Sequence, residues 1–251
     1  MNTTLIRTSV LASAALLLAT VAEAAPLPVQ VSLNGAPVGV VSWTPDPAPG
    51  AFVTAQTTFL NTINIGESLL EPTSNPAGAG WSFSYGLGFN VPANTLASTL
   101  KVVYDIPFGP NYLPSPAQPL LVTSTLIGTL LDGTGTGVQI ITPSSGFVQT
   151  VTFQPGIGNN VGVSVGPNAF GAATGNTGQQ FAYGEFSASG SLTSGSYGAM
   201  TVVAEFTLEP GTGAFAFDGT VTVTPVPEPE GWALILAGLG LVGTIVRRRK
   251  G

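Results

Sequence analysis

Residues 200–224 read MTVVAEFTLEPGTGAFAFDGTVTVT, and this stretch decides the fold class. On each side of the Pro-Gly-Thr-Gly segment at 210–213, apolar or small residues occupy every second position. Strict alternation is typical of a β-strand with one buried face. The segment between the two runs predicts a turn, so we expect the runs to form a β-hairpin. The alternating residues are Met200, Val202, Ala204, Phe206 and Leu208, then Phe215, Phe217, Gly219, Val221 and Val223.

The same alternation extends over most of the chain between residues 25 and 225. It is strong at 81–90, where we expect Trp81 to be buried, and weaker at eight other segments. Only 52–62 and 63–71 leave a helical pattern open. Because the helices that connect parallel strands are missing, we predict a mainly β body, an antiparallel β-sandwich or jelly roll. The weaker segments are 28–33, 38–44, 100–106, 119–131, 137–142, 147–153, 160–165 and 180–188.

Charge and composition exclude several classes of protein. The chain has 251 residues, of which only 7% are charged, and it contains no cysteine and no histidine. Between residues 25 and 226 there is one basic residue, Lys101, and there are nine acidic ones, which is a net charge of −8. One lysine cannot neutralise a phosphate backbone, so we expect no nucleic-acid partner. Without cysteine, packing and backbone hydrogen bonds must hold the fold.

The N-terminus predicts a secretory signal peptide over residues 1–24. One positive charge, Arg7, precedes an apolar run at 10–21, and an Ala-x-Ala site follows it. Twelve apolar residues are too few to span a bilayer, which disfavours the alternative of a retained anchor. We therefore expect signal peptidase to cut between Ala24 and Ala25, with Ala22 as the other small residue of the site, and the body 25–225 to be secreted.

The C-terminus, residues 226–251, has three parts. A stiff proline-rich segment comes first, an uncharged run from Gly231 to Val246 follows, and a basic cluster ends the chain. As a helix, the sixteen uncharged residues would be about 24 Å long, somewhat short of a hydrocarbon core of ~30 Å. Trp232 at one interface and arginines at the cytoplasmic one would make a marginal transmembrane helix. The flanking residues are Val226, Pro227, Glu228 and Pro229, then Arg247, Arg248, Arg249 and Lys250.

These three parts in this order resemble the PEP-CTERM sorting signal of Gram-negative bacteria. The resemblance implies that exosortase recognises the tail, cuts near Pro227-Glu228-Pro229 and removes the helix with its basic cluster. The protein would then be held only transiently in the inner membrane before it reaches the cell surface or the extracellular matrix, in association with polysaccharide, biofilm or floc. An ordinary tail anchor is the alternative, but it gives no reason for Pro-Glu-Pro. The resemblance covers the tail alone and implies nothing about the fold or activity of 25–225.

The body offers little catalytic chemistry. Without histidine and cysteine, nucleophile–base systems and the usual zinc and copper sites are absent, and we expect no cofactor. A carboxylate pair, as in glycoside hydrolysis, is the remaining option. Glu205 and Glu209 would lie about 13 Å apart on one strand, beyond the ~5–9.5 Å that such pairs use. Glu185 or Asp218 could serve only if either lay opposite them on a neighbouring strand, and solvated strand charges are the usual case.

Two weaker sites complete the candidates. Asp132, in Asp-Gly-Thr, could offer oxygen atoms to calcium, but one carboxylate is a weak site for an ion that takes six to eight oxygens. We expect a plain turn and no metal. Trp43 and Tyr112 lie near predicted loops and are the candidates for stacking on sugar rings.

The sequence thus predicts an exported, non-catalytic surface or extracellular-matrix protein that is sorted by its tail. The alternatives are a carbohydrate-binding β-sandwich module and, less favoured, a glycan-active enzyme that uses a carboxylate pair.

Overall fold

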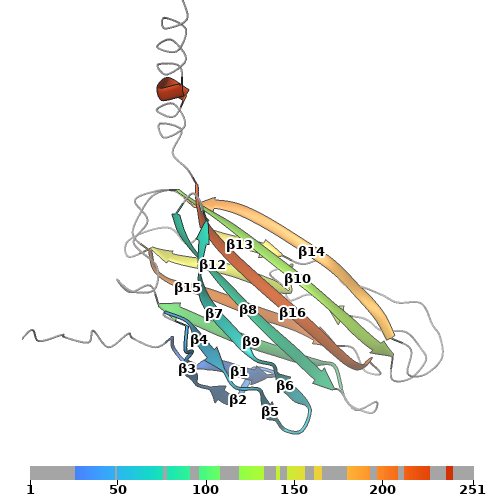
Figure 1. The fold of residues 1–251 in the computed structure, drawn as a ribbon. Helices are drawn as coiled ribbons and strands as arrows, with labels where there is room; N and C mark the ends of the chain where they lie inside the picture. Colours follow the sequence, from blue (N-terminus) through green and yellow to red (C-terminus); the bar gives the residue numbers. More distant parts are fainter. Residues whose placement is uncertain are drawn as a thin grey trace, which may run out of the picture.

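The body is built from two antiparallel β-sheets packed face to face as a sandwich (Figure 1). This is a computed structural model, which describes residues 26–48, 50–75, 78–90, 96–107, 119–132, 140–141, 146–155, 161–165, 180–192, 197–208, 212–226 and 236–239. Every strand pairing within these ranges is antiparallel. The prediction of a mainly β, antiparallel sandwich is confirmed.

The first sheet, sheet A, has seven strands. Its order is β13-β12-β15-β9-β1-β2, and β11 also pairs with β15. The bounds are β1 Val29–Leu33, β2 Ala36–Val41, β9 Ser98–Pro107, β11 Ile140–Ile141, β12 Gln149–Pro155, β13 Val161–Val165 and β15 Tyr197–Leu208.

The second sheet, sheet B, has nine strands. Its order is β14-β10-β16-β8-β7-β4-β3, and the β5–β6 pair joins it through β8. The segments 52–62 and 63–71, for which a helix remained open, are therefore strands and turns. The bounds are β3 Trp43–Pro45, β4 Phe52–Thr54, β5 Thr57–Phe59, β6 Ile63–Ile65, β7 Ser68–Asn75, β8 Gly78–Asn90, β10 Leu120–Asp132, β14 Gln180–Leu192 and β16 Thr212–Pro225.

The predicted hairpin between residues 200–208 and 215–224 is wrong. β15 pairs with β9 and β12 in sheet A, whereas β16 pairs with β8 and β10 in sheet B. The two strands face each other across the core, where the rings of Phe206 and Phe215 meet edge to face at 4.3 Å. A hairpin and a crossing between sheets bury the same alternate residues, so the pattern alone does not distinguish them.

A tight hairpin does join β1 and β2, and its turn has a characteristic Asn-Gly sequence. Leu33 pairs with Ala36, which leaves Asn34 and Gly35 as a two-residue loop with φ values of 51° and 79°. Positive φ at both positions is the requirement of a type I′ turn, and Asn-Gly is the pair that meets it most readily.

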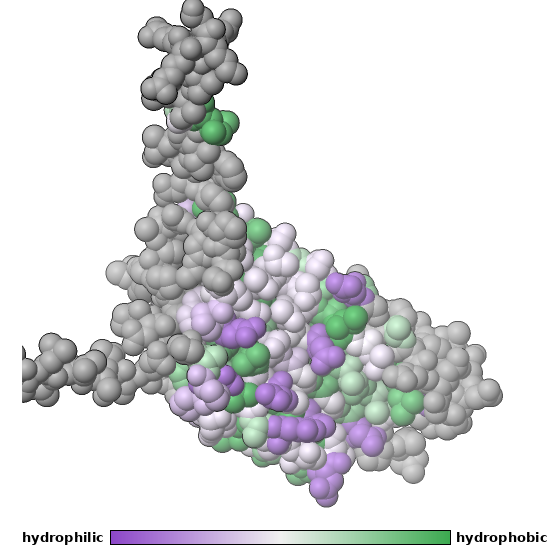
Figure 2. All heavy atoms as spheres, in the orientation of Figure 1, coloured by the Kyte–Doolittle hydropathy of each residue, from purple (hydrophilic) through white to green (hydrophobic). Residues whose placement is uncertain are grey.

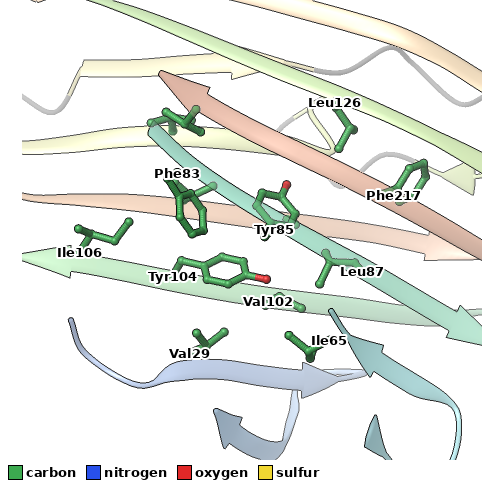
Figure 3. Packing of buried hydrophobic residues seen from close by; sticks show 14 of the residues in the cluster. Val29, Ile65, Phe83, Tyr85, Leu87, Val102, Tyr104, Ile106, Leu126 and Phe217 are labelled. Carbon is green, nitrogen blue, oxygen red and sulfur yellow. The ribbon is translucent and has the colours of Figure 1, made fainter. Parts of the chain in front are cut away.

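The space between the sheets is filled by large aromatic and aliphatic side chains. Figure 3 shows Phe83 and Tyr85 from β8 lying against Tyr104 from β9. The ring centroids of Phe83 and Tyr104 are 4.9 Å apart, and those of Tyr85 and Tyr104 are 5.0 Å apart. Trp81 is buried, as predicted. Alternation along the strands thus places one continuous core between β8 and β9 and their neighbours.

Most of both terminal segments lies outside the described residues. This applies to the signal segment with Ala22, Ala24 and Ala25, and to the predicted transmembrane helix from Trp232 to Val246 apart from one short helix at 236–239. Among the described residues, no helix combines the length and apolar character that crossing a membrane requires.

Candidate functional site

The sorting tail joins the body directly at the end of a core strand. β16 ends at Pro225, which pairs with Leu120 of β10. The next residue, Val226, donates its backbone N–H to the carbonyl oxygen of Pro119 at 2.8 Å. The sheet ladder thus holds the chain up to Val226, the first residue of the predicted motif. The motif residues Pro227, Glu228 and Pro229 and the basic residues Arg247, Arg248, Arg249 and Lys250 lie outside the described residues.

Glu205 forms an ion pair with a lysine. It lies on the outer face of sheet A opposite Lys101 of β9, and the Lys101 Nζ and Glu205 Oε2 atoms are 2.9 Å apart. Both side chains are partly exposed, so the ion pair contributes only about 0–1 kcal/mol. Glu209 lies outside the described residues.

Glu185 and Asp218 lie in the other sheet, so neither is opposite Glu205. Both are neighbours of Ile127 in the same row of sheet B, Glu185 on β14 and Asp218 on β16. Two strand spacings place their Cα atoms about 10 Å apart, with Ile127 between them. Both carboxylates are exposed. Exposed carboxylates lack the buried surroundings in which a proton-donating carboxyl is normally tuned.

The proposed sugar-stacking role of Trp43 is contradicted by its burial. Only 7% of Trp43 is exposed, its ring packs against Phe83 at 6.1 Å, and its indole N–H donates to the carbonyl of Leu27 at 3.1 Å. A buried indole with a satisfied donor is part of the core. Tyr112 lies outside the described residues.

Asp132 also differs from its prediction, because it is fully buried at the end of β10 and is not an exposed turn carboxylate. Gly133 and Thr134 lie outside the described residues. Within the described ranges there is no group of three or more acidic, histidine or cysteine side chains that could hold a metal ion.

A buried polar group links the two sheets, and the sequence analysis missed it. Gln149 of β12 in sheet A is fully buried; its Oε1 accepts a short hydrogen bond from the Tyr85 hydroxyl of sheet B. Its Nε2 donates to Ser124 Oγ at 2.6 Å. We call Tyr85, Gln149 and Ser124 the polar bridge. Gln149 lies two and four residues before the buried Val151 and Phe153, so it faces the same side of the strand. This two-residue spacing was the sequence signal that Gln149 is buried.

The polar bridge requires a glycine beside it. A Cβ at residue 219 would overlap the Tyr85 ring and lie only 2.5 Å from Gln149 Oε1. Burial raises the pKa of Tyr85 well above its usual value, and Tyr104 and Asp218 raise it further. The hydroxyl is therefore neutral and donates a hydrogen bond to Gln149 Oε1.

Among the hollows of the described surface are two shallow ones. One, of about 370 Å³, lies over β1, β2 and β9 on the outer face of sheet A; Lys101 is its charged lining residue. The other, of about 280 Å³, lies over β10 and β16 and has Phe215 among its lining residues. The first has no aromatic residue in its lining, and the second has no charged one.

The C-terminal segment matches a known protein-sorting motif. The family description that matches it is the PEP-CTERM protein-sorting motif, over residues 225–250. These residues are a PEP-CTERM motif. The motif implies an exported protein that exosortase sorts and processes. It begins at Pro225, the last residue of β16.

Comparison with proteins of known structure adds only distant likenesses. The enzymatically active domain of bacteriophage CBA120 tailspike protein 4 is 12% identical with a TM-score of 0.23; the match covers 75% of this chain but only 18% of the tailspike chain. TmCBM61, solved with β-1,4-galactotriose, is 10% identical over 79% of this chain and 89% of its own, with a TM-score of 0.19. At these scores the likeness supports no inference about function. No curated protein matches the chain.

Proposed function

We propose that this chain is an exported, non-catalytic surface or extracellular-matrix protein, whose PEP-CTERM motif is a temporary membrane handle. The observation that carries the proposal is the junction at Val226. The last core strand is hydrogen-bonded up to the residue before Pro227, so a cut within the Pro-Glu-Pro segment removes the tail and leaves every strand of the sandwich intact.

The tail has the properties of a handle that is held and then removed. Its uncharged run of sixteen residues, Gly231 to Val246, contains four glycines and is short for a bilayer, while Arg247, Arg248, Arg249 and Lys250 keep its end in the cytoplasm. The signal peptide sends the body across the membrane first. Exosortase then separates the body from the handle, and the product is free to join the cell surface or its polysaccharide.

A non-catalytic body is supported by the carboxylates that could have served catalysis. Glu205 pairs with Lys101, and Glu185 and Asp218 are exposed on either side of Ile127. The carbohydrate-binding alternative is weakened because Trp43, one of its two candidate stacking residues, is buried in the core. A body with few charges and many hydroxyl side chains is compatible with a neutral polysaccharide matrix, whereas its negative charge disfavours acidic glycans.

The sorting step is tested by replacing Pro227, Glu228 and Pro229 together with alanine and measuring the intact mass of the protein in its host. We expect the wild type to be found without residues 232–250 and the variant to retain them in the inner membrane. The matched control replaces Pro37 and Pro45, two exposed prolines of the body, with alanine and should be processed normally. A wild-type protein that still carries Trp232 through Lys250 at its destination would overturn the proposal.

The matrix role has a separate test. Removal of the whole chain from the host should reduce the polysaccharide retained by cells and their aggregation, and its return should restore both. Unchanged retention and aggregation would contradict this role while leaving the sorting route intact.

A further inference from the structure

The outer face of sheet B carries an ordered array of hydroxyl side chains. Figure 2 shows this face, where residues near the middle of the hydropathy scale form a pale area over the upper part of the sheet. Ten serine and threonine residues point outward from four adjacent strands, and none of them is buried. We call them the hydroxyl grid: Ser82 and Ser84 of β8, Thr220, Thr222 and Thr224 of β16, Thr123 and Thr125 of β10, and Ser187, Ser189 and Ser191 of β14.

The strand register aligns these residues in rows. One row is Ser84, Thr220, Thr125 and Ser187, and the next is Ser82, Thr222, Thr123 and Ser189. Thr224 and Ser191 belong to a third row, separated by the partly exposed Leu121. The register shifts in β10 lie beyond the grid, at Gly128 and Leu131.

The array has a fixed repeat in two directions. Outward residues recur about every 6.8 Å along a strand and about every 4.8 Å from one strand to the next. The strands cannot slide, because the residues between the hydroxyls, among them Phe83, Val221 and Val223, are packed in the core. The grid is therefore a rigid, two-dimensional lattice of groups that each donate and accept hydrogen bonds.

Charge and shape restrict what such a lattice can bind. No charged side chain lies within the rows; Glu71, Glu185 and Asp218 lie at their borders. Neither of the two hollows described above is lined by a grid residue. It also contains no aromatic ring on which a sugar could stack. A neutral and periodic partner is complementary to it.

We propose that the hydroxyl grid binds the surface of ice crystals. Ice presents a neutral lattice of O–H donors and acceptors, and it has no charge or ring for other side chains to recognise. Serine and threonine hydroxyls join such a lattice as water molecules do, and the threonine methyl groups order the water between them. Single hydroxyl contacts are weak, so binding depends on many of them engaging together. This function goes beyond sorting and does not depend on it.

The test is incorporation of the exported protein, purified from its host, into slowly grown ice. We expect at least a tenfold enrichment over a non-binding protein of similar charge, and inhibition of ice recrystallisation. Thr222→Lys places a charge at the centre of the grid and should abolish the enrichment. Thr150→Lys places the same charge on the outer face of sheet A and should leave it unchanged. Circular dichroism checks folding, and Ser189→Lys on the exposed strand β14 replaces Thr222→Lys if that variant unfolds.

Three results would overturn the proposal. They are a wild type that is not enriched in ice, a folded grid variant that is enriched as strongly as the wild type, and a protein that binds insoluble neutral polysaccharide through Thr222 but does not bind ice. The last result would reassign the grid to a glycan surface. Because each arm uses exported protein, none of them depends on whether exosortase made the final cut.

Discussion

Two groups of side chains lie between the same two sheets and connect them in different ways. The first, which we call the phenylalanine cluster, consists of Phe89, Phe206, Phe215 and Phe217, whose rings meet at centroid distances of 4.3–5.8 Å. The second is the polar bridge of Tyr85, Gln149 and Ser124. The cluster has no polar side-chain atom, so any well-packed arrangement of its rings satisfies it. The bridge has donors and acceptors that only one alignment of the sheets can satisfy.

This difference shows that stability and alignment come from different parts of one core. Burial of aromatic area stabilises the sandwich without a strong directional requirement. The polar bridge adds less net stability, since each hydrogen bond replaces one with water, but leaving one of its partners alone is costly. The predictions below separate the two contributions.

The largest effect is expected in the phenylalanine cluster. Phe206 is fully buried, and its ring contacts Phe215 and Phe217 across the sheets. Phe206→Ala removes these contacts and leaves a cavity, so we expect a loss of about 3–5 kcal/mol in the free energy of unfolding. Denaturant titration of the exported protein measures it. Phe147→Ala is the matched control, because Phe147 is 38% exposed and its truncation should cost much less. Equal losses for both variants would contradict the role of the cluster.

Alternation along the strands predicted the cluster but not the bridge. The inward positions of Phe206, Phe215 and Phe217 follow from period-two patterning, which depends on burial alone. Sheet membership depends on pairings between residues far apart in the chain, so the same pattern suggested a hairpin where β15 and β16 occupy opposite sheets. A polar residue at an inward-facing position, such as Gln149, interrupts the alternation of apolar and polar residues. It is recognised as buried only when the alternation is continued through it to the next inward-facing residues.

In the candidate site, too, local features could be predicted from the sequence and contacts between distant strands could not. The PEP-CTERM motif was recognisable because its function requires three local features in a fixed order, and local features can be seen in the sequence. The position of Trp43 in the core, and the separation of Glu205 from Glu185 and Asp218, depend on which strands meet in space. No local pattern carries that information.

The next effect concerns alkaline pH and tests both tyrosines of the central core. Burial raises the pKa of Tyr104, and burial also raises the pKa of Tyr85. In the unfolded chain both ionise near the ordinary value of about 10, while the folded protein keeps them neutral. The stability that the two neutral tyrosines contribute is therefore complete below pH 10 and is lost as the pH rises above it. The free energy of unfolding falls by up to about 1.4 kcal/mol per pH unit for each tyrosine.

Denaturant titrations between pH 8 and pH 11.5 measure this loss. Tyr104→Phe removes a buried hydroxyl that makes no hydrogen bond among the described residues, so it should reduce the alkaline slope without lowering stability at pH 8. Phe has no proton to lose, and the remaining slope then reports Tyr85. A stability that is constant up to pH 11.5 would show that both hydroxyls ionise in the folded protein and are accessible to water.

The smallest effect is expected in the polar bridge, and its size depends on how many partners are removed. Gln149→Leu keeps the volume of the side chain but leaves the buried Tyr85 hydroxyl without its acceptor, so we expect a loss of about 1–3 kcal/mol. Removing both groups, in Tyr85→Phe with Gln149→Leu, should recover much of that loss, because two apolar neighbours need no hydrogen bond. The double-mutant cycle measured by denaturant titration gives the coupling, expected at about 0.5–3 kcal/mol. Additive losses would mean that the two residues act independently, and alignment of the sheets would then rest on packing alone.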